Sequence, residues 1–216
     1  LIPAGFCLKC DICCRFMDRF SQMRPYFLYE EVEKAGKHSL KPFKKSRASL
    51  ISLVRHKNMY ICPYFYPKKN SCAIYNIRPF DCRLYPFLLS HKDGGVFLCA
   101  DLNCPFISKN IKNKSLKDYT FYLKKIFSNE KLINKILKNK ALIGTYTDDV
   151  VFLARLKRLS KKLHEHGKHP AGMPVVPLSR RAAFSSHSSI PKLQDGFLRR
   201  RDKNLRGGIK LIAIKL

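Results

Sequence analysis

Acidic residues are scarce in this chain of 216 residues, which has 15 Asp and Glu against 43 Lys and Arg. The formal net charge of +28 exceeds what solubility requires, and it suggests an anionic partner such as nucleic acid, an acidic protein or an anionic membrane surface. The alternative is that the lysines only cover solvated helix faces, because no basic block is long. Composition leaves both interpretations open.

Several other features are missing. The sequence has no run of eighteen apolar residues, so we expect no transmembrane helix. It shows no signal peptide, and a cytoplasmic, reducing compartment is therefore the expected location. Neither "DGG" nor "RGG" has the spacing of a phosphate-binding loop, and no Ser/His/Asp triad has local support. These absences weigh against a nucleotide-dependent enzyme.

Cysteine is absent after Cys104, and all nine cysteines lie between Cys7 and that residue. In a reducing compartment, thiols in this number indicate metal or redox chemistry rather than a disulfide framework, and their odd count agrees. Four of them open the chain within "CLKCDICC", and five follow at wider spacing. The full set is Cys7, Cys10, Cys13, Cys14, Cys62, Cys72, Cys82, Cys99 and Cys104.

The opening pattern C-x2-C-x2-C-C can wrap a metal within one loop, since thiolates bind zinc and iron strongly. Adjacent Cα–Cβ vectors diverge, so we expect Cys13 and Cys14 to serve two centres, or one centre and a redox thiol. The later cysteines do not repeat C-x2-C, which disfavours an ordinary zinc ribbon. The Cys104-Pro105 pair is similar to the end of a bacterial ferredoxin motif. We therefore favour an iron–sulfur cluster over zinc.

These motifs together resemble the YkgJ-type cysteine-cluster family, also called CxxCxxCC, a zinc- or iron-chelating domain. The resemblance covers residues 5–107 and rests on "FCLKCDICCRF", "CPYFYPKKNSCAIYNIRPFDCRLYPF" and "DLNCPFI", with Phe106 where the family has glycine. It implies eight metal ligands: Cys7, Cys10, Cys13, Cys14, Cys62, Cys72, Cys82 and Cys104. Eight thiolates fit two four-cysteine centres, and Cys99 is the extra cysteine.

Two arginines flank Cys82 and are the candidate cofactor-binding residues. Arg78 and Arg83 would favour thiolate over thiol and tune a bound cluster. Alternatively, they pair with Asp81, Asp101 or backbone carbonyl groups. A further metal site formed by His164, His166 and His169 is the weaker candidate. The run "CPYFYPKK" either packs in the core around Cys62 or stacks on bases.

The chain reads as an α+β protein with three parts. Residues 1–110 form a small irregular cysteine-rich metal-binding domain, 111–163 a helical extension of it, and 164–216 a basic, poorly ordered tail. Predicted elements are a helix over 29–36, a strand pair turning at "HKN" and a strand after "DGG". Ser115 and Asp118 predict a helix start. A break follows at 128–129, then a second helix, and a third capped by Thr147 or Asp148. The third helix has an apolar stripe of Val150, Leu153, Leu156, Leu159 and Leu163.

The sequence predicts a cytosolic protein that holds an iron–sulfur cluster or zinc, in a structural or redox role. One alternative is an enzyme related to flagellin lysine N-methylases, since a related cysteine domain occurs there. The other is a basic nucleic-acid-binding protein with structural metal. We also expect the first half to need metal for folding, because its predicted secondary structure is sparse.

Overall fold

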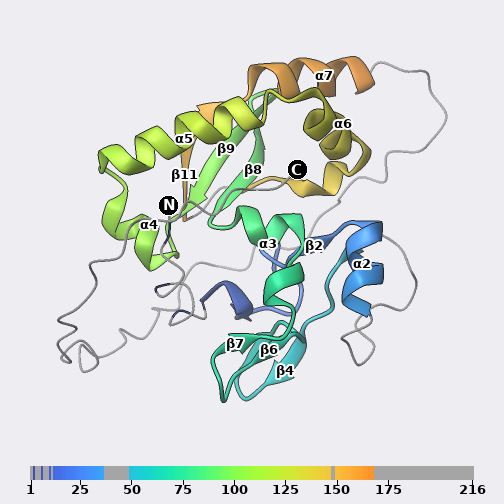
Figure 1. The fold of residues 1–216 in the computed structure, drawn as a ribbon, viewed down its shortest axis with the longest axis vertical. Helices are drawn as coiled ribbons and strands as arrows, with labels where there is room; N and C mark the ends of the chain where they lie inside the picture. The colour runs from blue at the N-terminus through green and yellow to red at the C-terminus, as the bar shows by residue number, and fades with distance from the viewer. Residues whose placement is uncertain are drawn as a thin grey trace. The chain divides into compact units, whose positions relative to one another are not determined.

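The computed structural model describes residues 2, 6, 10, 12–36, 49–146 and 149–167. Helices and strands mix along this part of the chain, which confirms the expected combination of the two (Figure 1). Cys7, His169 and the expected tail from residue 168 onward lie outside the described residues. None of the described helices is long and apolar enough to cross a membrane.

The first elements are short and alternate with turns. They are η1 (Ile12–Cys14), β1 (Arg15–Phe16), β2 (Tyr26–Phe27), α2 (Tyr29–Gly36), β3 (Ser49–Leu50), β4 (Val54–His56), β5 (Met59–Ile61), β6 (Phe65–Tyr66), β7 (Ser71–Cys72) and η2 (Tyr75–Ile77). They form a three-stranded sheet in the order β1-β5-β4 and two-stranded pairs β2-β3 and β6-β7. Helix α2 confirms the predicted helix, and the β4–β5 hairpin confirms the turn at "HKN".

A four-stranded sheet organises the later elements. These are α3 (Phe80–Leu84), β8 (Phe87–Lys92), β9 (Gly95–Asp101), α4 (Pro105–Asn110), α5 (Lys114–Ile126), α6 (Glu130–Lys138), η3 (Lys140–Leu142), β10 (Ile143–Gly144), β11 (Val150–Arg155) and α7 (Lys157–Gly167). The strand order is β10-β8-β9-β11, with β10 parallel to β8 and the other neighbours antiparallel. The "DGG" turn joins β8 to β9, as predicted; Asp93 and Gly94 take the positive φ values that such a tight turn needs.

The predicted third helix is wrong in its first half. Residues 150–155 form β11, which pairs with β9, and the helix begins only at Lys157. Val150, Val151 and Phe152 are β-branched or aromatic residues that suit a strand, and the edge of β9 offers them hydrogen-bonding partners. In β11 it is Val151 and Leu153, two residues apart, that pack against the larger core, whereas Val150 and Leu153 of the predicted stripe fall on opposite faces of a strand. The end of the stripe at Leu156 and Leu159 is buried, as the helix requires.

The start of α5 also differs from the prediction. Asn113 precedes the helix with extended backbone angles, and the helix begins at Lys114, so Ser115 lies in the first turn rather than before it. The Asn113 side chain donates a hydrogen bond to the Asn110 side-chain oxygen, 2.6 Å away, which ties this residue to the end of α4. The break at residues 128–129 and the following helix α6 are confirmed.

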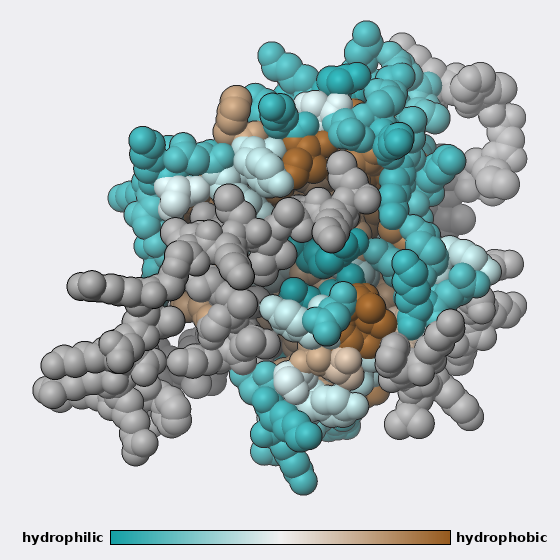
Figure 2. Space-filling model, in the orientation of Figure 1, coloured by the Kyte–Doolittle hydropathy of each residue, from teal (hydrophilic) through white to brown (hydrophobic). Residues whose placement is uncertain are grey.

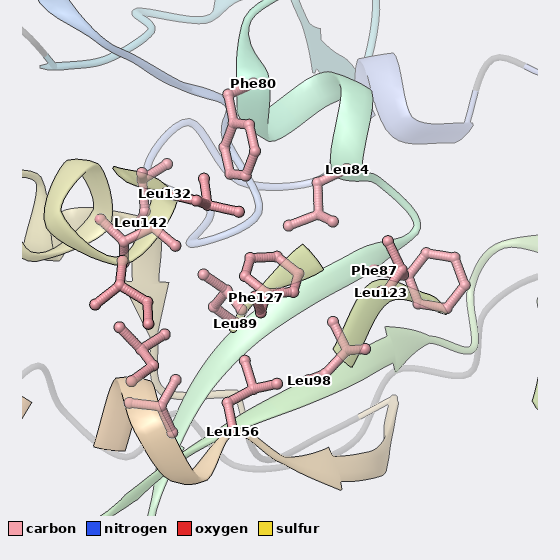
Figure 3. Packing of buried hydrophobic residues seen from close by; sticks show 14 of the residues in the cluster. Phe80, Leu84, Phe87, Leu89, Leu98, Leu123, Phe127, Leu132, Leu142 and Leu156 are labelled. Carbon is pink, nitrogen blue, oxygen red and sulfur yellow. The ribbon is translucent and has the colours of Figure 1, made fainter. Parts of the chain in front are cut away.

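Two clusters of buried apolar side chains hold these elements together. The larger one joins the four-stranded sheet to α3, α5, α6 and α7, and Figure 3 shows Phe127, Leu89 and Leu98 within it. The smaller one packs Phe16, Phe27, Ile51, Tyr64 and Phe65 beside α2. Helix α7 packs against β9, and hydrophilic residues cover much of the described surface in Figure 2.

Candidate metal centre

A cavity of about 80 Å³ is lined by six of the nine cysteines. The six are Cys10, Cys13, Cys14, Cys62, Cys72 and Cys82. Its walls include Phe27, Phe65 and Ile74, which belong to the smaller core, and Tyr85, which packs against the larger one. Residues that are far apart in the sequence therefore bring their thiols to one place.

Backbone pairing places the cysteines. Strands β1 and β5 pair Arg15 with Ile61, and just beyond this pair the Cys62 N–H donates a 3.0 Å hydrogen bond to the Cys14 carbonyl oxygen. Cys72 ends β7, opposite Phe65 of β6. Cys82 lies in the short helix α3, which starts after Pro79. Proline suits this position because the residue lies before the first helical hydrogen bonds.

The adjacent pair Cys13 and Cys14 faces one cavity. Their sulfur atoms lie 3.9 Å apart, and both side chains are half-buried. The expected divergence of the two side chains is therefore not what the structure shows. Both residues belong to the 3-10 turn η1, whose tight winding carries them on one short segment.

Burial and mutual proximity raise the pKa values of these thiols. The pKa of Cys13 is raised by its contact with Cys14 and by burial, although the Arg78 guanidinium acts in the opposite direction. Burial raises the pKa of Cys62 to about 12, and nearby Cys72 and Cys13 add to this rise. Burial also raises the pKa of Cys82 far above its usual range. Each thiolate charge would oppose its neighbours, and a cation among them would relieve that repulsion.

The two candidate arginines have different surroundings. Arg78 lines the cavity, lowers the pKa of Cys13 and Cys72, and also donates to the Tyr75 carbonyl oxygen at 3.1 Å. The bond to the Tyr75 carbonyl oxygen confirms that Arg78 pairs with the backbone, and its role toward a cofactor stays a prediction. Arg83 lies 3.8 Å from the buried carboxylate of Glu31. That partner was not among those expected from the sequence.

Cys104 lies at the start of α4 beside a hydrogen-bonded turn. Asp101 accepts hydrogen bonds from the Tyr85 hydroxyl at 2.9 Å and from the Asn103 N–H at 2.8 Å. The Cys104 N–H donates to the Asp101 carbonyl oxygen at 3.3 Å. Burial raises the pKa of Cys104, and the charge of Cys10 adds to that rise. Cys10 and Tyr85, which both line the cavity, are thus the residues that connect Cys104 with it.

Tyr146 is a cavity residue that the sequence did not single out. Its ring lines the cavity, and burial raises the pKa of its hydroxyl. The ring passes so close to Gly144 that a Cβ on that glycine would lie 2.5 Å from the Tyr146 Cζ atom. The Tyr146 N–H donates to the Ser90 hydroxyl at 3.2 Å.

The remaining candidates lie elsewhere. Cys99 is fully buried in β9, opposite Leu88 and Phe152. A ring nitrogen of His164 lies 2.5 Å from the Gly94 carbonyl oxygen, whereas His166 is exposed. Tyr64 and Phe65 of "CPYFYPKK" are buried in the smaller core, so the packing interpretation is correct for these two residues.

The donor chemistry of the cavity fits a metal that prefers sulfur, because thiols dominate its polar side chains. Within the described ranges, no three His, Cys, Asp or Glu side chains converge as the ligands of one ion do. The structure thus brings the donors to one cavity without closing them into a coordination sphere.

Comparison with known families gives one match. The model of the CxxCxxCC family, described as a "putative zinc- or iron-chelating domain", matches residues 6–105. The match confirms the resemblance found in the sequence, and it spans the six cavity cysteines as well as Cys104. No curated protein and no solved structure matches the chain.

Proposed function

We propose that this CxxCxxCC chain is a metal-binding protein whose cavity cysteines hold an iron–sulfur cluster or zinc. The observation that carries the proposal is the convergence of six cysteines, from four separate segments, on one small cavity. Burial and mutual proximity raise the pKa values of these thiols, so ionised thiolates at this place need a positive charge beside them. A bound metal supplies the positive charge that makes the arrangement favourable.

The cysteines that influence one another's pKa fall into two groups, and this grouping supports two metal centres. Cys62, Cys72 and Cys82 each interact with Cys13, which groups these four around the cavity. Cys104 interacts instead with Cys10. We assign the first four to one centre, with Cys14 beside Cys13, and the second pair to another. Arg78 is the residue that favours thiolate in the first centre.

Iron–sulfur is favoured over zinc by the pattern of the cysteines. Their spacing departs from the paired knuckles of zinc ribbons, and Cys104 is followed by proline as in ferredoxin motifs. When bound, a cluster of this kind supplies one-electron chemistry, whereas zinc held by four thiolates is structural. The protein contributes the same groups in both cases. The cysteine thiols are the ligands, the apolar side chains of Phe27, Phe65 and Ile74 form part of the cavity wall, and Arg78 supplies one positive charge.

Metal analysis and visible absorption of anaerobically purified protein test the proposal. Iron with inorganic sulfide and charge-transfer absorption identifies a cluster, and one or two colourless zinc ions per chain identify zinc. Protein that contains less than about 0.1 metal ion per chain, and that stays metal-free after reconstitution with either metal, would contradict metal binding. The enzyme and nucleic-acid alternatives remain predictions.

A further inference from the structure

The outer face of helix α5 exposes aromatic rings to solvent. Phe121 is 72% exposed, more than any other phenylalanine or tyrosine in the described part of the chain, and Tyr122 beside it is 41% exposed. The opposite face of the helix is already buried, because Leu116 and Leu123 pack in the larger core. Packing against that core therefore does not account for an aromatic residue at position 121, and neighbouring exposed rings are typical of a surface that meets a partner.

Four lysines lie around Phe121 on the same face of α5. A helix turns by about 100° per residue, so residues three, four or seven positions apart share one side. Each lysine of α5 stands at one of these distances from Phe121, and each is exposed. The four are Lys114, Lys117, Lys124 and Lys125. Asp118 is the one acidic residue of the helix, so four lysines against one aspartate leave three excess positive charges around the ring.

The combination of rings and ammonium groups distinguishes between anionic partners. In single-stranded nucleic acids the bases can stack on an aromatic ring while lysines contact the phosphates, and such binding needs no particular sequence. A helix that binds a membrane surface instead inserts a continuous apolar face among the lipids. The apolar face of α5 is buried in the larger core, so it is not available for that purpose. The face therefore favours a nucleic acid over a membrane.

We propose that the outer face of α5 binds single-stranded nucleic acid. Phe121 stacks on a base, with Tyr122 beside it, and the four lysines neutralise the neighbouring phosphates. This contact gives part of the net charge of +28 a specific partner. It does not depend on the metal proposal, because neither aromatic residue and none of the four lysines lines the cysteine cavity.

Fluorescence anisotropy of the full chain, with its metal as isolated, tests this face. The probes are a labelled oligothymidine of about twelve nucleotides and an abasic strand of equal length, at about 50 mM salt, where charge interactions are only partly screened. The abasic strand has the same phosphates without bases. We expect oligothymidine to bind at least about fivefold more tightly, because it alone can stack. Equal affinities for the two strands would show that no base stacks, and would overturn the proposal.

Variants of the ring and of the lysines locate the contact. We expect Phe121→Ala to weaken the binding of oligothymidine at least about fivefold and to change that of the abasic strand less than about twofold. Lys117→Gln/Lys124→Gln should reduce the slope of log affinity against log salt by about one. Lys68→Gln/Lys69→Gln removes the same charge from the exposed β6–β7 turn and should change this slope less than half as much.

Two kinds of result would contradict these expectations. Wild-type affinity of Phe121→Ala for oligothymidine, or equal effects of the two lysine variants, would show that α5 is not the binding face. If Phe121→Ala instead loses binding to vesicles of phosphatidylserine and phosphatidylcholine, and keeps its affinity for oligothymidine, the face binds a membrane and the proposal is wrong. All the substituted side chains are exposed, so we expect each variant to fold; circular dichroism and metal content check this.

Discussion

The backbone N–H of Cys62 donates a hydrogen bond to the carbonyl oxygen of Cys14, over 3.0 Å. This bond joins two cysteine-bearing segments through the main chain and continues the pairing of β1 with β5. Main-chain pairing therefore helps to bring the thiols of these two segments to the same cavity.

Glu31 joins α2 to α3 and provides the first test. Its carboxylate accepts hydrogen bonds from the Leu28 N–H at 3.0 Å and the Phe80 N–H at 2.7 Å, and Arg83 lies nearby. Glu31→Ala leaves two buried donors unpaired, so we expect it to lower the free energy of unfolding by about 2–4 kcal/mol. Urea denaturation followed by circular dichroism measures the loss.

The matched control is Glu30→Ala in the same helix. Glu30 pairs with Lys135 at 2.9 Å, but both side chains are about half exposed. An exposed ion pair contributes under about 1 kcal/mol, so this variant should unfold nearly as the wild type does. If the two variants lose similar amounts of unfolding free energy, the hydrogen bonds of Glu31 do not stabilise the contact between α2 and α3.

Ser160 tests the corrected position of α7. Its hydroxyl oxygen accepts a 2.9 Å hydrogen bond from the Val96 N–H of β9, and the residue is buried. We expect Ser160→Ala to cost about 1–3 kcal/mol in unfolding free energy, because the Val96 N–H loses its partner away from water. Ser128→Ala removes only a surface hydrogen bond and serves as the control. If thermal and urea unfolding cannot distinguish the two variants, this contact between α7 and β9 is not stabilising.

Gly144 and Tyr146 allow a double-mutant cycle at the cavity wall. A Cβ on residue 144 would overlap the Tyr146 ring, so Gly144→Ala should cost about 1–3 kcal/mol of unfolding free energy through overpacking. In a Tyr146→Ala background the obstacle is gone, and we expect the same change to cost much less. If Gly144→Ala lowers the unfolding free energy equally in both backgrounds, the Tyr146 ring does not clash with a side chain at residue 144.

Local signals predicted much of the fold. The acidic start of α2, the "HKN" and "DGG" turns and the break before α6 depend on neighbouring residues, and the structure has all of them. Strand β11 was missed because its pairing with β9 is a non-local contact, while its apolar stripe also suits a helix. Periodicity alone cannot decide between the two when the partner strand is distant in sequence.

The residues of the candidate site were also only partly predictable from the sequence. The family resemblance singled out eight cysteines, and six of them line the cavity in the described part of the chain. The buried carboxylate of Glu31 and the ring of Tyr146 could not be found in this way, since their roles arise from packing between distant segments. The shared cavity of Cys13 and Cys14 was not expected, because the prediction considered only the diverging Cα–Cβ directions of adjacent residues.

Metal stoichiometry in two cysteine variants tests the central claim most directly. Cys82 lines the cavity and is partly buried, whereas Cys99 is buried in β9, is not among the cavity residues and serves as the control. After anaerobic purification, we predict that Cys82→Ser loses at least half of the metal bound by the wild type, while Cys99→Ser keeps all of it. If Cys82→Ser retains full metal content, or if Cys99→Ser loses as much, the cavity cysteines do not form the metal centre.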